Sequence, residues 1–261
     1  MLRLVDVAGG AGFRIRAVHC TDDHRGWSAA ESRAGYGVVL VRSGRFRRMV
    51  DGSAGDVDPT RGYLMVPGAE ECFSHPAGGD LCTWVELSPA LWHSVAADTR
   101  PNPTIFVDAR LDLGHRRLLA AARIGDVGFG VAEWLLRTLA YALRVAPPGG
   151  SARDRTMVAA AQDAIAADHP ASAGLLPLAE LIGVSPHRLS RAFVRETGVS
   201  LTRYRNRVRV GRALDHLEAG GTGLAALAAD LGFADQSHLC RTVRAHLGHT
   251  PTELRRLLSA G

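Results

Sequence analysis

The sequence contains no lysine, so all 31 of its basic residues are arginines. Arginine stays charged at any cellular pH, and its planar guanidinium matches phosphate groups and the edge of guanine. The formal net charge is +5 and is unevenly spread. Residues 1–150 hold 17 arginines against 16 acidic residues, whereas residues 151–261 hold 14 against 10. The basic second part favours an anionic partner, above all nucleic acid.

Long apolar runs are missing as well. None reaches the ~18–20 residues that a membrane-spanning helix needs, and the first residues lack the apolar stretch of a secretory signal. We therefore expect a cytoplasmic protein. Cysteine is scarce, and no CxxC pair occurs among Cys20, Cys72, Cys82 and Cys240. This scatter favours reduced thiols over a disulfide framework.

The motifs of common enzyme classes do not occur. The sequence has no GxSxG, no P-loop and no GxGxxG that opens a helix after a strand. Adjacent acids such as Glu70 and Glu71 stand in a segment that we predict to be a solvated loop. We therefore expect a protein that is not an enzyme and that uses no cofactor.

The length of 261 residues, of which 46% are hydrophobic, suits two globular domains. A Pro-Pro-Gly-Gly stretch at 147–150 stops any helix and marks a linker. We place this linker at 147–154, between an N-terminal domain at 1–146 and a C-terminal domain at 155–261. The predicted fold class is α+β.

Short apolar segments separated by turns fill the first part of the chain. We predict strands at 13–18, 36–41, 62–68 and 81–87, a spacing typical of a small barrel or sandwich. Helices are predicted at about 115–124 and 130–145. The second helix has an apolar face that either packs on the barrel or pairs with a second subunit. This face consists of Trp134, Leu135, Thr138, Leu139, Ala142 and Leu143.

The C-terminal domain carries the pattern of a helix-turn-helix unit at about 176–198. A short apolar helix stops at Gly183, and Ser185 and Pro186 suit the cap and the first position of the next helix. Apolar residues at helical spacing form the inward face of that next helix, which leaves polar side chains on the other face. The inward residues are Leu189, Ala192 and Phe193.

A second unit at about 224–248 repeats this pattern. Gly232 stops its first helix, Phe233 fills the turn and Asp235 caps the second helix. The inward residues of that helix are Leu239 and Val243. Between the units, residues 201–217 predict an arginine-rich helix about 25 Å long. A helix of this length would hold the two recognition helices about one DNA turn apart.

Over about 155–258 the chain resembles the DNA-binding domain of the AraC/XylS family of transcription regulators. The residues that carry the resemblance are Gly183-Val184-Ser185-Pro186, Leu189 to Phe193, Glu196-Thr197-Gly198, Arg209-Val210, Ala213, Leu217, Leu231 to His238, Gly248, Thr250-Pro251 and Arg255. Leu239 and Val243 depart from the family, in which aromatic residues are usual there. The resemblance implies an activator or repressor that binds promoter DNA and acts with RNA polymerase. It also implies a cupin-like barrel at about 10–90 that senses a small molecule or forms a homodimer.

The outward faces of the two recognition helices supply the predicted DNA-binding residues. These are His187, Arg188, Ser190, Arg191 and Arg195 in the first unit, and Gln236, Ser237, His238, Cys240, Arg241 and Arg244 in the second. Arg191 and Arg241 are predicted to contact guanine, and Gln236 adenine, because these pairings are bidentate in the major groove.

We predict that DNA phosphates are contacted by Arg188, Arg195 and Arg244. Contacts with phosphates add affinity but carry no sequence information. The arginines of 201–217 are predicted to form a solvated face. We expect at least one of them to pair with an acid such as Asp215.

The alternative hypothesis is a cupin-type metalloenzyme, or a metal or redox sensor, fused to a DNA-binding domain. Its candidate ligands are Cys72, His75 and Cys82, with His19 or Cys20 on a neighbouring strand. Enzymatic cupins carry an HxH pair, which this sequence lacks. We therefore predict no metal. A third hypothesis is a regulator without a small-molecule ligand, controlled by its abundance or by an antagonist protein.

Overall fold

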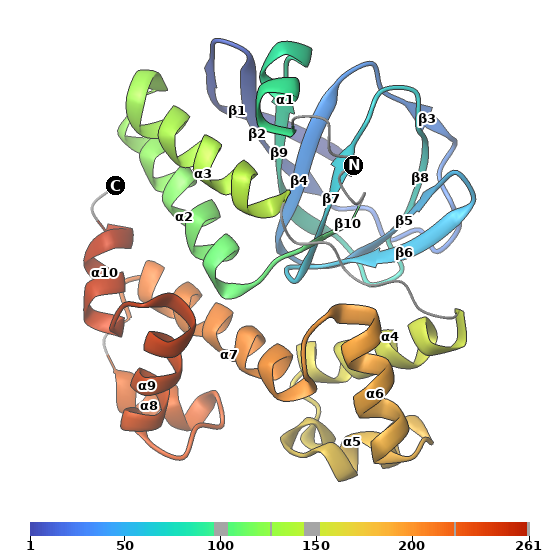
Figure 1. Ribbon diagram of the computed structural model, residues 1–261, viewed down its shortest axis with the longest axis vertical. Helices are drawn as coiled ribbons and strands as arrows, with labels where there is room; N and C mark the ends of the chain where they lie inside the picture. Colours follow the sequence, from blue (N-terminus) through green and yellow to red (C-terminus); the bar gives the residue numbers. More distant parts are fainter. Residues whose placement is uncertain (97–103, 126, 144–151, 222, 260–261) are drawn as a thin grey trace. The chain divides into compact units, whose positions relative to one another are not determined.

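The computed structural model describes residues 1–96, 104–125, 127–143, 152–221 and 223–259 (Figure 1). The chain divides into two compact units between Ala146 and Pro147. Of the predicted linker, residues 147–151 lie outside the described part, and Asp154 already belongs to a helix. Within the described ranges, no helix combines the length and the apolar character that crossing a membrane requires.

Two antiparallel sheets form the front unit. The first has the strand order β1-β2-β9-β4-β7-β10, and the second has the order β3-β8-β5-β6. The strands are β1 Leu2–Gly10, β2 Phe13–Cys20, β3 Glu31–Ser32, β4 Tyr36–Ser43, β5 Phe46–Val50, β6 Ser53–Val57, β7 Arg61–Met65, β8 Glu70–Ser74, β9 Asp80–Leu87 and β10 Thr104–Phe106. The four predicted strands are confirmed as β2, β4, β7 and β9, and all four lie in the first sheet.

Strand β4 shows how the layers of this unit are built. Val38 and Leu40 pack in the core between the first sheet and the helices, whereas Val39 and Val41 pack against Phe46 of the second sheet. Because successive side chains point to opposite faces and both faces are covered, this strand is a continuous apolar run.

Helices cover the outer face of the first sheet. They are α1 Pro89–Ala96, α2 Ala109–Ile124 and α3 Ala132–Ala142, the last preceded by a π-helical turn at Val127–Val131. Figure 1 shows α2 and α3 side by side. Leu135 and Leu139 of α3 join the core that contains Ile15 and Val38. The predicted apolar face of this helix therefore packs within its own unit.

The described residues of the rear unit form helices joined by turns, and no strand lies among them. Its helices are α4 Ala152–Ala166, α5 Leu175–Ile182, α6 Pro186–Thr197, α7 Leu201–Glu218, α8 Leu224–Asp230, α9 Gln236–Leu247 and α10 Pro251–Ser259, with a 3-10 turn at Pro170–Ala173. Helix α7 separates α4 to α6 from α8 to α10 (Figure 1). The α+β fold class, with a β-rich front and a helical rear, is confirmed.

The expectation of a loop at Glu70 and Glu71 is wrong, because both residues belong to β8; Glu70 is exposed as predicted, whereas Glu71 is not. Glu71 is only 3% exposed and forms an ion pair with Arg48. The same guanidinium donates to the Leu64 carbonyl at 3.2 Å. Alternation along β8 turns Glu71 inward, and a buried carboxylate requires such a partner.

Candidate nucleic-acid interface

Hydrogen bonds fix both ends of the turn in the first helix-turn-helix unit. Helix α5 ends at Gly183, whose φ of +73° is left-handed, and the amide of Val184 donates to the Ala179 carbonyl at 3.0 Å. On the other side, the Ser185 hydroxyl accepts from the amide of Arg188 at 3.3 Å. These are the helix stop and the helix cap that the sequence predicted.

The second unit repeats this construction. Gly232 has a φ of +67°, and the amide of Phe233 donates to the Ala228 carbonyl at 2.8 Å, the same five-residue return as in the first unit. The Asp235 carboxylate caps α9 by accepting from the amide of His238 at 2.6 Å. Equivalent bonds in both turns support the predicted internal repeat.

The inward, apolar faces of both recognition helices are buried in the core of the rear unit. Leu189 and Phe193 of α6 are fully buried, as is Leu239 of α9, and Val243 is 1% exposed. The aliphatic residues that depart from the family pattern in α9 therefore still fill the core. Each recognition helix therefore has one buried apolar face and one polar face.

Exposure on the polar faces follows the predicted pattern. The exposed predicted residues are His187, Arg188, Arg191 and Arg195 on α6, and Gln236, Ser237, Arg241 and Arg244 on α9. Ser190, His238 and Cys240 are half-buried.

Helix α4 contributes an acid that the sequence analysis did not include. Asp154, itself buried, lies 2.8 Å from Arg195 and 3.9 Å from Arg188, measured between carboxylate oxygen and guanidinium nitrogen. Among the described residues, Arg191 and Arg241 form no ion pair. The arginines predicted to contact bases are thus free, whereas Arg195 has a partner inside the domain.

His238 also serves the fold. Its ring packs edge-on against Phe233 with centroids 5.3 Å apart, and its Nδ1 lies 3.4 Å from the amide nitrogen of Ala234. These contacts stabilise the second turn and hold the imidazole at the start of α9.

The arginines of α7 mostly serve the fold instead of forming a solvated face. The guanidinium of Arg209 lies over the Phe233 ring, 5.5 Å from its centroid. Arg205 and Arg212 each donate to a backbone carbonyl at 2.7 Å, and Arg212 also pairs with Asp168 at 3.3 Å. The expected pairing of one such arginine with an acid is therefore confirmed. The face is less solvated than predicted because these side chains fasten α7 to its neighbours.

A family model described as a helix-turn-helix domain matches residues 178–257. The rear unit is an AraC-type helix-turn-helix domain. The transcriptional activator RhrA of Rhizobium meliloti (strain 1021) is 32% identical over 91 residues, which is 34% of this chain and 29% of RhrA. The chain thus matches less than a third of the length of this relative.

Two solved structures are similar to parts or all of the chain. One is the C-terminal domain of AraT, a response regulator from Geobacillus stearothermophilus, at 25% identity and a TM-score of 0.37, covering 40% of this chain and 88% of that one. The other is ToxT from Vibrio cholerae O395, at 10% identity and a TM-score of 0.38, covering 96% of this chain and 99% of that one.

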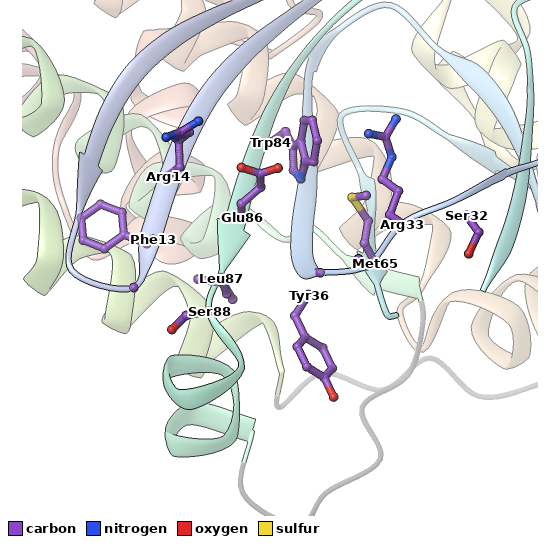
Figure 2. Close-up of a pocket in the computed structure, with 13 residues that line it drawn as sticks. Phe13, Arg14, Ser32, Arg33, Tyr36, Met65, Trp84, Glu86, Leu87 and Ser88 are labelled. Carbon is purple, nitrogen blue, oxygen red and sulfur yellow. The ribbon is translucent and has the colours of Figure 1, made fainter. Parts of the chain in front are cut away.

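Besides the AraC-type domain, the protein has a groove in its front unit, with a volume of about 640 Å³ (Figure 2). In this view Trp84 of β9 lies between Glu86 and Arg33. The guanidinium groups of Arg16 and Arg33 lie over the Trp84 ring, 4.6 and 4.8 Å from its centroid, and the indole nitrogen is buried without a hydrogen-bond partner.

The predicted metal candidates are brought together only in part. His75 and Cys82 both lie within 3.1 Å of a carboxylate oxygen of Asp80, which the sequence analysis did not include. Cys20 reaches the same group, 3.4 Å from His75. Cys72 is half-buried on β8 outside this group, and His19 is exposed. Burial raises the pKa of the Cys20 and Cys82 thiols, which disfavours the thiolate that oxidants attack.

Proposed function

We propose that this protein is a sequence-specific DNA-binding transcription regulator of the AraC/XylS type. In this proposal α6 and α9 enter adjacent major-groove segments of promoter DNA, about 10 base pairs apart. The observation that carries it is the pair of capped helix-turn-helix units, each with a closed apolar face and an exposed polar face. Arg191 and Arg241 occupy the exposed faces without an ion-pair partner among the described residues.

Specific roles follow from the chemistry of these side chains. Arg191 and Arg241 would fork onto guanine O6 and N7, and Gln236 onto adenine N6 and N7. The shorter or half-buried Ser190, Ser237 and Cys240 would line the same faces. The five remaining predicted contacts, which bring the total to eleven, are His187, Arg188, Arg195, His238 and Arg244.

Two of those residues receive narrower roles. Arg195 pairs with Asp154 and His238 packs on Phe233, so both would reach DNA only as secondary contacts. Arg244 is exposed and suits a phosphate contact.

The spacing of the units supports binding along one side of a duplex. Helix α7 has 18 residues and therefore a length of about 27 Å. Successive turns of the major groove on one face of DNA lie about 34 Å apart. A rigid helix of this length between two recognition units suits neighbouring groove segments.

Regulation through the front unit belongs to the same proposal. A small-molecule effector would bind there, a homodimer would form through it, and the bound complex would act on RNA polymerase. The groove beside Trp84 supports an effector, since it combines apolar walls with arginine and glutamate side chains. We further propose that the protein acts in the cytoplasm and catalyses no reaction.

The test measures binding of the full chain to its own promoter region and to a scrambled duplex. We expect Arg191→Ala and Arg241→Ala each to lose roughly tenfold to a hundredfold of the preference for the promoter. Arg110→Ala is the matched control, because Arg110 is exposed on α2 in the front unit. The proposal is wrong if the parent prefers no promoter to the scrambled duplex. The recognition assignment alone is wrong if both variants keep the preference.

A further inference from the structure

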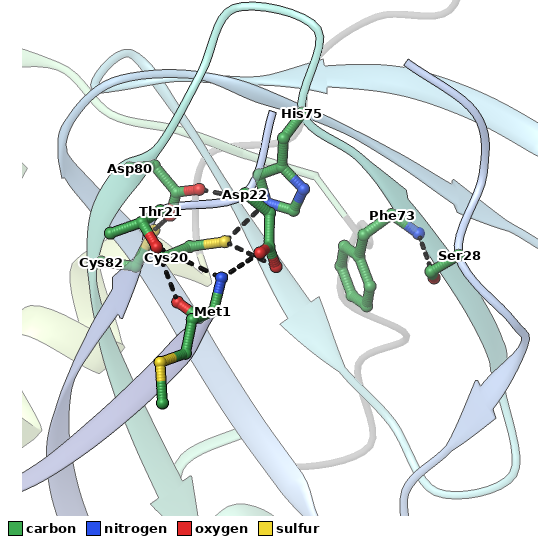
Figure 3. Close-up of polar contacts among 9 residues, drawn as sticks. All are labelled: Met1, Cys20, Thr21, Asp22, Ser28, Phe73, His75, Asp80 and Cys82. Atoms are coloured by element: carbon green, nitrogen blue, oxygen red, sulfur yellow. Dashed lines mark hydrogen bonds and ion pairs between the residues drawn. The ribbon is translucent and has the colours of Figure 1, made fainter. Parts of the chain in front are cut away.

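Three different metal-binding side chains converge in the front unit (Figure 3). The Nε2 atom of His75 lies 3.4 Å from the Cys20 sulfur and 3.1 Å from Oδ2 of Asp80. Strand pairing explains part of this convergence, because Cys20 of β2 stands opposite Asp80 of β9. His75 follows β8 and reaches the pair from the loop before β9. All three residues are more than nine-tenths buried.

Hydrogen bonding alone leaves this group incompletely satisfied. One imidazole nitrogen faces both the sulfur and the carboxylate, although a single nitrogen carries one proton or one lone pair. Nδ1 of His75 is buried without a hydrogen-bond partner in the described structure, and Oδ2 of Asp80 has only its 3.1 Å ion-pair contact with Nε2 of His75. In a Cys-His-Asp catalytic relay the acid and the thiol would use opposite ring nitrogens. Here both point at the same nitrogen, which suits a shared central ion.

Two of the three distances between the ligand atoms are close to the edges of a tetrahedral site. With bonds of about 2.3 Å to sulfur and 2.0 Å to nitrogen and oxygen, tetrahedral angles place neighbouring ligand atoms roughly 3.3–3.6 Å apart. The observed separations of 3.4 and 3.1 Å are close to this range, and all three ligand atoms lie within 4.8 Å of one another. Thiolate, imidazole and carboxylate together are donors that zinc accepts, whereas calcium and magnesium prefer oxygen alone.

The surroundings supply an orienting group and an open side. The Cys82 thiol donates to the other carboxylate oxygen of Asp80 at 2.9 Å, which fixes the direction of that carboxylate. The three converging residues also line a cavity of about 210 Å³, together with Phe46 and Phe73. Asp22 lines the same cavity and accepts from the Cys20 thiol at 3.5 Å, so a fourth coordination position on that side would take its carboxylate, water or a small molecule.

We propose that Cys20, His75 and Asp80 bind one divalent ion of the zinc type in the front unit. Cys82 acts as a positioning residue for Asp80. On binding, the Cys20 thiol gives its proton to solvent and its sulfur forms a bond to the ion, with no change of oxidation state. The site differs from the predicted set of Cys72, His75 and Cys82, and it extends the proposed function without depending on it.

The experiment loads the chelator-stripped, reduced full chain with Zn²⁺ in competition with a chromophoric chelator. We expect one ion per chain and an affinity at least tenfold lower in Cys20→Ser, His75→Gln and Asp80→Asn. Cys72→Ser is the matched control and should bind like the parent, because Cys72 lies outside the group. Thermal unfolding without metal identifies any variant that fails to fold.

Co²⁺ gives a second readout that reports the thiolate ligand directly. A thiolate-to-cobalt charge-transfer band should be present in the parent, absent in Cys20→Ser, and retained with weaker affinity in Cys82→Ser. The inference is overturned if the parent takes up no stoichiometric Zn²⁺, or if folded Cys20→Ser keeps both the affinity and the band. Neither measurement involves DNA, so its outcome is independent of whether the protein is a regulator.

Discussion

The imidazole of His115 lies 2.8 Å from the hydroxyl of Thr83, and both side chains are almost completely buried. Helix α2 and strand β9 meet at this contact. Burial, and next the charge of Arg42, lower the pKa of His115 to about 3. The histidine is therefore neutral in the folded protein between about pH 6.5, where an unfolded chain becomes protonated, and about pH 3.

This contact predicts a loss of stability in acid. Below about pH 6.5 the unfolded chain binds a proton at His115 while the folded protein does not, so the free energy of unfolding falls as the pH decreases towards 3. The slope from this residue approaches about 1.4 kcal/mol per pH unit. Denaturant unfolding at several pH values should show a shallower fall in His115→Gln than in the parent. His19→Gln, at an exposed site on β2, should leave the slope unchanged; equal slopes in all three proteins would contradict the prediction.

The buried ion pair of Arg48 and Glu71 makes a second prediction. Glu71→Gln leaves the Arg48 charge inside the front unit without its counter-charge, and we expect a loss of about 3–5 kcal/mol in the free energy of unfolding. The double variant Arg48→Met with Glu71→Leu should recover much of this loss, because an apolar pair leaves no buried charge. A single variant as stable as the parent would show that the pair is not desolvated.

The two turn glycines give a matched comparison in the AraC-type domain. Gly183 and Gly232 both have left-handed backbones, at φ of +73° and +67°. A Cβ on Gly183 would meet open space, whereas one on Gly232 would lie 2.8 Å from a guanidinium nitrogen of Arg209. Alanine should cost about 1–2 kcal/mol of stability at either site from the backbone alone. Gly232→Ala should cost more, since it also displaces Arg209 from Phe233; equal losses in thermal unfolding would count against this packing.

Two arginines of α9 should differ in what they contribute to DNA binding. Arg241→Ala should relax the base preference at one position of the binding site, because we propose that Arg241 contacts guanine. Arg244→Ala should weaken binding to all sequences about equally and reduce the slope of log affinity against log salt by roughly one. Titrations against single-base variants of the bound site at several salt concentrations separate the two effects. The assignment is reversed if Arg244→Ala changes the base preference and Arg241→Ala does not.

Local signals in the sequence were sufficient to predict the helices and turns of the AraC-type domain. Gly183, Ser185, Gly232 and Asp235 define the turns through backbone conformation and capping, and both effects act within a few residues. The front unit was harder, because β5, β6 and β8 are short and their burial depends on which strands they pair with. Glu71 illustrates this point: its partner Arg48 stands 23 positions away and is reached only across the second sheet.

The convergence of Cys20, His75 and Asp80 could not be predicted for the same reason. The predicted strands ended at residue 18 and began at residue 81, so they stopped short of Cys20 and Asp80. Extending both strands and aligning them in register would have placed these two residues opposite each other. Asp154 was missed because α4 begins within the segment that was assigned to the linker.

Helix α7 is more than a spacer, since its Tyr204 packs edge-on against Phe193 of α6 and its Arg209 covers Phe233. Each residue inserted into a continuous helix rotates everything beyond it by about 100° and advances it by about 1.5 Å. The number of residues in α7 therefore affects the angle at which one helix-turn-helix unit is rotated relative to the other. An insertion within α7 would change both the distance and the angle between the two helix-turn-helix units.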